Sequence, residues 1–287
     1  MAFLLLHNYT DFILISNIIY NIKVKLHIFI ITINIKEGHM RKRKNLYSKL
    51  YYIFISVLII TIIVIAFILY KTREDKQNRS LDYYSNFEEL KENTMEGKDW
   101  RIKTKNRKDN HILVTAIHGG GIEPGTTELA RRVANIGEYD FYTFEGLMPK
   151  HNERLHITST VFDEPTLLKM LDHSDETISI HGYSGEDPIV YVGGKDKKLA
   201  KSITKSLKNK GFTVQKSPKG IEATSSSNII NRSDNDSGVQ LELTTGQRAL
   251  FFKDKQLDQN TRKNPDNYTH TFYKFAKAVN KGIEDAQ

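Results

Sequence analysis

The apolar residues of this chain follow two different patterns. Residues 51–70 form one uninterrupted run, YYIFISVLIITIIVIAFILY, which contains no charged residue, no glycine and no proline. From residue 112 onward, short apolar runs alternate with stretches of helical periodicity. A helix of about 20 residues is about 30 Å long, which is the thickness of the hydrocarbon core of a bilayer. The first pattern therefore predicts a membrane-spanning helix, and the second predicts an α/β domain.

Strands of the α/β domain are predicted where the apolar runs are short and rich in β-branched and aromatic residues. These runs are residues 112–117, 141–144, 155–158, 177–181, 189–192, 212–214 and 239–243. Helices are predicted at residues 127–136, 165–171, 197–208 and 268–285, with a short helix at 87–93 and a strand at 100–103 ahead of them. This order predicts a mixed, mainly parallel open sheet with helices on both faces.

Basic residues determine the predicted orientation of the membrane span. The motif MRKRK at residues 40–44 precedes the apolar run, whereas residues 71–75 after it carry mixed charge. Because cytoplasmic flanks carry the excess of Lys and Arg, we expect the N-terminus in the cytoplasm and the C-terminal domain outside the cell. A cleaved signal peptide would have a shorter apolar region of about 7–15 residues, followed by small residues. The pattern therefore favours an uncleaved anchor and a single-pass protein of the cell membrane.

These patterns divide the chain into four predicted regions. Residues 1–49 form an N-terminal cytoplasmic segment, part of which would be absent if translation starts at Met40. Residues 50–70 are the transmembrane signal anchor, residues 71–98 are a linker, and residues 99–287 are the main domain.

Charge and cysteine content exclude several kinds of protein. The 287 residues include 42 Lys and Arg and 34 Asp and Glu, a net charge of +8. Residues 1–70 hold eight of the basic residues and two acidic ones, so residues 71–287 carry 34 basic and 32 acidic residues, a net of +2. We therefore expect no nucleic-acid binding by the main domain. Without cysteine, the chain has no disulfide, no Cys-ligated zinc and no Cys nucleophile.

Residues 112–128, ILVTAIHGGGIEPGTTE, permit two different chemistries. The HGGG motif at residues 118–121 is typical of the oxyanion loop of lipase-like α/β-hydrolases, which also need a G-x-S-x-G elbow between a strand and a helix. The nearest match, GYSGE at residues 182–186, has its second glycine one position early and is followed by a predicted strand. The serine-hydrolase interpretation therefore fails on spacing and on context.

A metal site is the second interpretation of the same stretch. His118 and His181 each end a predicted apolar strand, and each is followed at once by glycine. A single histidine in this position is more often structural, but two in the same context point to a shared role. Glu123 follows His118 by five residues, and the glycines between them allow the backbone to turn back. Two histidines and a glutamate form a familiar catalytic zinc set, which leaves a fourth position for water.

Two further groups could complete such a site. Glu242 lies in an alternating strand, where periodicity alone favours a solvent-facing residue. A zinc hydrolase, however, needs a carboxylate near its water to accept a proton. Asn231 and Arg232 lie in a polar loop, and a guanidinium with a neighbouring amide is suited to hold a substrate carboxylate.

Five sequence blocks identify a family that this chain resembles. They are HGGGIEPGT (118–126), RLHITSTVFDEP (154–165), SIHGYSGE (179–186), NIINR (228–232) and GVQLEL (238–243). In this order they resemble the phage-type poly-γ-glutamate hydrolases, which are zinc-dependent amidohydrolases with a carboxypeptidase-like α/β fold. The resemblance covers about residues 99–252. The predicted membrane anchor departs from the family pattern, because the phage enzymes are compact and soluble.

The resemblance implies a role for each candidate residue. By position, zinc would be held by His118, Glu123 and His181; the general base would be Glu242; and substrate would contact Arg232, Asn231, His156 and Arg248. A zinc-activated water would attack the amide, while the general base moves a proton from this water to the leaving amine.

The implied partner is a polyanionic γ-glutamyl polymer or peptide, and we expect the enzyme to act as a monomer. Two alternatives remain open on the same fold. One is a zinc peptidase that cleaves γ-glutamyl linkages of cell-wall peptide, and the other is a non-catalytic surface binding protein.

Overall fold

The computed structural model describes residues 51–65, 82–107 and 111–287. The chain divides into two units, Met1–Lys71 and Thr72–Gln287, and all of the sheet lies in the second. The predicted boundaries at residues 49, 70 and 98 stay predictions.

The predicted membrane span is wrong. Within the described parts of the chain, no helix is both long and apolar enough to cross a membrane. The described helix in this region covers residues 51–65. The predicted single-pass membrane location, with its extracellular domain, loses its basis with the span. Residues 50 and 66–70 of that prediction lie outside the described residues.

A seven-stranded sheet forms the centre of the second unit, in the order β1-β3-β2-β4-β7-β5-β6. Its strands are β1 (Trp100–Lys105), β2 (Ile112–Gly120), β3 (Asp140–Gly146), β4 (Glu176–Tyr183), β5 (Ile189–Gly194), β6 (Thr213–Lys216) and β7 (Gly238–Thr244). The central strands β3, β2, β4 and β7 are parallel, β1 is antiparallel to β3, and β5 is antiparallel to β7. The predicted mixed, mainly parallel sheet is confirmed.

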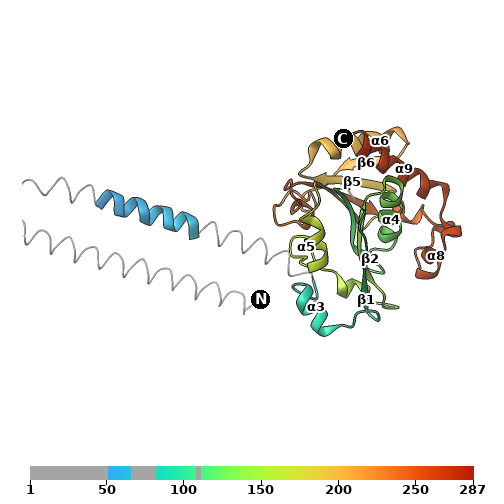
Figure 1. Cartoon of the computed structure of the whole chain (residues 1–287), viewed down its shortest axis with the longest axis horizontal. Coiled ribbons are helices and arrows are strands. Elements are labelled where there is room, and N and C mark those ends of the chain that lie inside the picture. The colour runs from blue at the N-terminus through green and yellow to red at the C-terminus, as the bar shows by residue number, and fades with distance from the viewer. Residues whose placement is uncertain (1–50, 66–81, 108–110) are drawn as a thin grey trace, which may run out of the picture. The chain divides into compact units, whose positions relative to one another are not determined.

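Helices cover both faces of this sheet, as predicted (Figure 1). One face packs against α4 (Thr126–Gly137), α6 (Lys197–Asn209) and α9 (His270–Glu284). The other face packs against α3 (Phe87–Asn93) and α5 (Pro165–Leu171). The remaining helical segments are η2 (Asn152–Leu155), η3 (Ile229–Asn231), α7 (Thr245–Ala249), η4 (Lys253–Lys255), α8 (Gln259–Lys263) and η5 (Pro265–Asn267).

Caps and apolar positions explain why these segments are helical. The Asp196 carboxylate accepts the Leu199 amide at the start of α6, and Thr269 caps α9 in the same way through the Phe272 amide. Such caps satisfy backbone donors that have no partner inside the helix. In α3, the buried Phe87 lies edge-on to the buried Trp100 of β1, with ring centroids 5.3 Å apart. Residues 82–98, which the sequence pattern assigned to a linker, therefore contribute packing to the domain.

One predicted strand is wrong, at residues 155–158. The chain forms η2 up to Leu155 and continues as irregular backbone. Leu155 and Ile157 are both buried, but they pack onto the face of the sheet instead of joining it. Alternating burial in a loop that covers a sheet produces the same apolar pattern as a strand, so periodicity alone could not separate the two.

The order in which the chain adds strands to the sheet reverses at β2. After β2 the chain crosses to β3 on one side, and it later returns to place β4 on the other side. In open α/β sheets, ligands bind beyond the carboxyl ends of the strands at such a reversal. The fold thus points to the carboxyl ends of β2 and β4.

Candidate metal centre

An extra residue in β2 determines where the His118 side chain points. Residues 116–119 of β2 lie opposite residues 143–145 of β3, so three steps along one strand match two along the other. The register of β2 against β4 would otherwise place His118 and His181 on opposite faces of the sheet. An extra residue of this kind re-aims a side chain. Here it brings the two imidazoles together, with ring centroids 4.9 Å apart.

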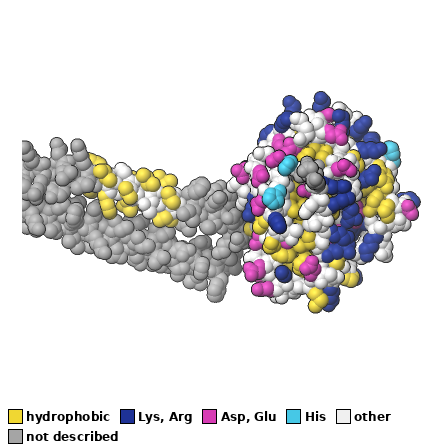
Figure 2. Space-filling view, in the orientation of Figure 1, with side chains coloured by type: hydrophobic (Ala, Val, Ile, Leu, Met, Phe, Trp, Pro, Cys, Tyr) yellow, Lys and Arg dark blue, Asp and Glu magenta, His cyan; other side chains and the backbone are white. Residues whose placement is uncertain are grey.

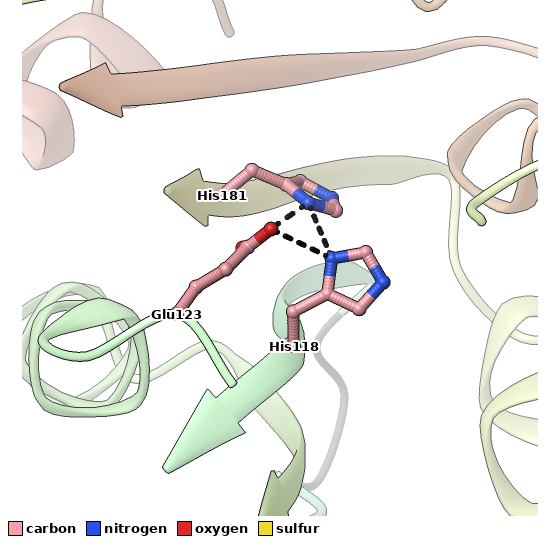
Figure 3. A group of neighbouring side chains, drawn as sticks. All are labelled: His118, Glu123 and His181. Atoms are coloured by element: carbon pink, nitrogen blue, oxygen red, sulfur yellow. Dashed lines mark hydrogen bonds and ion pairs between the residues drawn. The ribbon is translucent and has the colours of Figure 1, made fainter. Parts of the chain in front are cut away.

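Glu123 reaches the two histidines from the loop that follows β2 (Figure 3). The loop turns back because the Glu123 amide donates to the His118 carbonyl oxygen at 2.9 Å. The Glu123 Oε1 atom then lies 3.1 Å from His118 Nδ1, and Oε2 lies 3.6 Å from His181 Nδ1. The Gly182 amide donates to Oε2 at 2.7 Å, which fixes the carboxylate against the end of β4.

Hydrogen bonds at the outer nitrogens of the two histidines show which ring nitrogens face the centre. His118 Nε2 lies 2.8 Å from the Ile157 carbonyl oxygen, which can only accept a hydrogen bond, so Nε2 carries the hydrogen. His181 Nε2 is held by the Ser179 hydroxyl at 2.9 Å. The two Nδ1 atoms are left to face each other at 3.1 Å. Outer partners of this kind orient histidines that bind a metal.

The three side chains could hold a metal ion. One ligand atom from each of His118, Glu123 and His181 lies within 4.8 Å of the others. Both histidines are 2% exposed, and two imidazole nitrogens together with a carboxylate in a buried space fit a cation. Burial raises the pKa of Glu123, but the charges and hydrogen bonds of both histidines outweigh burial and hold its pKa well below the usual range. The carboxylate is therefore ionised and ready to bind a cation.

Glu242 lies on β7 directly beside His181 of β4. The side chain is buried, and its Oε1 accepts a hydrogen bond from Gln240 Nε2 at 2.6 Å. Burial, followed by the negative charge of Glu123, raises the pKa of Glu242 to about 8. This strand residue is therefore not the solvent-facing one that periodicity favours; it faces the candidate centre.

His156 stacks on His118, with ring centroids 3.9 Å apart and planes inclined by 30°. Its Nδ1 lies 2.7 Å from Asp82 Oδ1, and the other oxygen of Asp82 accepts the Thr158 amide at 2.6 Å. Burial raises the pKa of Asp82, but the hydrogen bonds from His156 and Thr158 outweigh burial and lower it. Sequence reasoning missed Asp82, because it lies 74 residues before His156 in a polar segment without a recognisable motif.

Arg248 and Asn231 direct their polar atoms to the backbone. The Arg248 guanidinium donates to the carbonyl oxygens of Leu243, Pro124 and Tyr183, at 3.1, 2.8 and 3.3 Å. Arg248 therefore ties the loop that carries Glu123 to the ends of β4 and β7.

Asn231 also uses its side chain to hydrogen-bond the backbone. Its Nδ2 donates to the carbonyl oxygens of Ala223 and Ser225, each at 2.8 Å. Its Oδ1 accepts the Gly238 amide at 3.1 Å, at the start of β7. Arg232 is exposed beside it. Substrate contact by Asn231, Arg232 or Arg248 stays a prediction.

A family model and a bacterial relative match most of this chain. The family model described as poly-gamma-glutamate hydrolase matches residues 84–278. The UPF0714 protein YmaC of Bacillus subtilis (strain 168) is 35% identical over 229 residues, which cover 79% of this chain and 94% of that protein.

Two solved structures are similar over the same domain. A bacteriophage poly-gamma-glutamate hydrolase matches with a TM-score of 0.68 and 35% identity, over 71% of this chain and 97% of that chain. A structure described as YNDL-apo (zinc-free) matches with a TM-score of 0.66 and 38% identity, over 71% of this chain and 98% of that chain.

Proposed function

This chain belongs to the poly-γ-glutamate hydrolase family and is a hydrolase of γ-glutamyl bonds, and from this premise we propose that it is a zinc-dependent amidohydrolase. His118, Glu123 and His181 hold the zinc ion in this proposal. The observation that carries it is the convergence of two histidine Nδ1 atoms and one carboxylate, with each histidine fixed from behind through Nε2. A relative described as both apo and zinc-free supports zinc as the metal.

The substrate in this proposal is poly-γ-glutamate, and the reaction adds water across an amide bond. Zinc at such a site supplies a Lewis acid that polarises the carbonyl and makes water a stronger nucleophile at neutral pH. Glu242 is the general base: its pKa of about 8 belongs to the metal-free chain, and the positive charge of a bound zinc ion would lower this pKa and favour the carboxylate form. Its Oε1 is held by Gln240, so its other oxygen is the one that accepts the proton from the attacking water. The same carboxyl then protonates the departing amine nitrogen, which leaves one new carboxylate and one new amine.

The neighbouring residues bind and position the substrate in this proposal. His156 is fixed by Asp82 and stacked on His118, so it contacts the substrate next to the metal. The exposed Arg232 binds an α-carboxylate of the polymer, because a guanidinium pairs with a carboxylate through two parallel hydrogen bonds. Asn231 and Arg248 hold the loops around this space through the backbone contacts described above. We expect the enzyme to act as a monomer.

The zinc content of the purified full-length chain tests this assignment. We expect about one zinc ion per chain. His118→Ala and His181→Ala should each lose the metal, because two protein ligands cannot hold zinc in the buried site. Glu242→Gln serves as the matched control, since it alters a buried neighbour that is not a ligand. It should keep the metal and lose turnover by about 100-fold or more.

Two outcomes would contradict the assignment. One is a protein that binds no zinc although all three ligands are intact. The other is a Glu242→Gln variant with a turnover close to that of the unmodified chain.

A further inference from the structure

A basic cleft lies at the carboxyl ends of β2 and β3. It has a volume of about 240 Å³, many times the 10–15 Å³ that one buried water requires, so a group of several atoms can enter. Five cationic side chains line it: Arg101, Lys103, Arg131, Arg262 and Lys263. Figure 2 shows Lys and Arg side chains gathered on this side of the domain, in the region between β1, α4 and α8 of Figure 1.

Two glutamates pair with four of the five cations of the cleft without neutralising the group. The buried Glu145 carboxylate contacts Arg101 Nε at 2.5 Å, Lys103 Nζ at 3.3 Å and Arg131 Nη2 at 3.1 Å. One negative charge thus faces three positive ones. Glu128 pairs with Arg262 at 2.9 Å. Five cations against two carboxylates leave an excess of three positive charges in the cleft.

Donors in the cleft remain open to solvent. The side chains of Arg101, Lys103 and Arg131 are 40–42% exposed. Among the described residues, Arg101 donates a hydrogen bond only through Nε and Arg131 only through Nη2, so their other guanidinium nitrogens are available to a ligand. A guanidinium fixed in this way is suited to receive a carboxylate, because less side-chain freedom is lost on binding.

The cleft and the candidate centre lie at the same edge of the sheet, the cleft on the face that α4 covers and His181 on the face that α3 and α5 cover. Gly120 lines the cleft and follows His118 by two residues, so their Cα atoms are at most about 7.6 Å apart. Gly120 lies beside Gly146 in register, at the carboxyl ends of β2 and β3. The Gly120 amide donates to Thr127 Oγ1 at 3.0 Å, and the Gly121 amide donates to the Gly146 carbonyl at 2.9 Å. The glycines are closely packed, because a Cβ atom at Gly120 would lie 2.4 Å from the Gly146 carbonyl oxygen and one at Gly121 would lie 2.5 Å from Asn152 Nδ2. A polymer that reaches both sites therefore passes around the outside of this edge.

We propose that this cleft is a second substrate-binding site, which holds free α-carboxylates of a poly-γ-glutamate chain whose scissile bond lies at the metal centre. This inference rests on the proposed function. In a γ-linked chain the amide uses the side-chain carboxyl, so every residue keeps one negative α-carboxylate. A polymer long enough to reach from the metal centre around this edge gains contacts in the cleft, and a short oligomer does not. The cleft thus makes the enzyme favour long polyanionic substrates.

The test compares two double variants of the full-length chain that lose the same charge. Lys103→Gln with Lys263→Gln removes two cations of the cleft, while Glu145 keeps both arginines. Lys201→Gln with Lys208→Gln is the matched control, because both lysines are exposed on α6 and line a different cleft. KM is measured for long poly-γ-glutamate and for a γ-glutamyl trimer. Binding of fluorescently labelled polymer is measured by anisotropy in a Glu242→Gln background.

We expect the cleft variant to raise the ratio of the polymer KM to the trimer KM by roughly threefold to tenfold. Its polymer binding should weaken by a similar factor and depend less on salt. The α6 control should match the unmodified chain in both respects. An unchanged ratio, or an equal rise in the control, would overturn the proposal. If the unmodified chain hydrolyses no polymer, the proposed function fails, whereas the anisotropy measurement still decides whether the cleft binds the polyanion.

Discussion

At the scale of single residues, the candidate centre depends on which histidine nitrogen is free. The sequence indicated His118, Glu123 and His181 because each histidine ends an apolar strand and the glycines let Glu123 turn back. It could not indicate that a carbonyl oxygen and a serine hydroxyl occupy both Nε2 atoms and leave Nδ1 to face the centre. Nor could it indicate Asp82, which acts on His156 across 74 residues. Such contacts follow from tertiary packing and leave no local pattern.

Glu242 leads to a prediction about pH and stability in the metal-free protein. Burial and the charge of Glu123 raise its pKa from the ordinary 4.5 to about 8. Between these two values the native state binds a proton that the unfolded state has released. The free energy of unfolding should therefore fall as pH rises from about 4.5 to about 8. Urea unfolding at several pH values measures this fall.

Glu242→Gln should remove most of this fall, because the amide has a similar shape and does not titrate. The same exchange at the exposed Glu92 of α3 is the matched control, and it should leave the pH dependence as it is. A Glu242→Gln protein with the full pH dependence of the unmodified chain would show that another group is responsible.

At the scale of elements, periodicity predicted most helices and strands but not their irregularities. α4, α6 and β7 lie where the apolar pattern placed them, and α3 covers the predicted residues 87–93. The segment 155–158 differs because it packs onto the sheet as a loop, and its Ile157 carbonyl holds His118. The sequence pattern does not predict the extra residue in β2 either, because this residue is defined only by the register of β2 against β3. Without it, alternation would separate the two histidines.

Gly119 leads to a prediction about this irregular end of β2. A Cβ atom there would lie 2.2 Å from Thr127 Oγ1, 2.3 Å from Thr143 Oγ1 and 2.9 Å from the Phe144 carbonyl oxygen. Gly119→Ala must therefore displace the backbone beside His118. We expect a loss of about 1–3 kcal/mol in the free energy of unfolding and zinc affinity weaker by about tenfold or more.

Gly211→Ala is the control for Gly119→Ala. A Cβ atom at Gly211 would meet no atom within 4 Å, although its φ of +79° makes alanine less favourable there. This variant should lose about 1 kcal/mol of stability and bind zinc like the unmodified chain. Equal zinc affinities in the two variants would mean that the end of β2 does not position the ligands as argued.

At the scale of the whole molecule, the strand order places the chemistry. β2 lies between β3 and β4, and the candidate centre and the basic cleft both lie at the carboxyl edge of these strands. The sequence predicted a mixed sheet but not the order of its strands. Pairing between strands far apart in the chain sets this order, and local periodicity contains no information about such pairing. The predicted membrane span was wrong, since no described helix is long and apolar enough to cross a membrane.

The most direct test of the zinc amidohydrolase assignment is the length of poly-γ-glutamate after incubation with the full-length chain, measured by size-exclusion chromatography. Three samples are compared: zinc-loaded protein, protein stripped by a chelator, and stripped protein with zinc restored. The assignment predicts that the polymer is shortened by the first and third samples and stays intact with the second. Shortening that persists after zinc is removed, or an intact polymer after incubation with zinc-loaded protein, would contradict it.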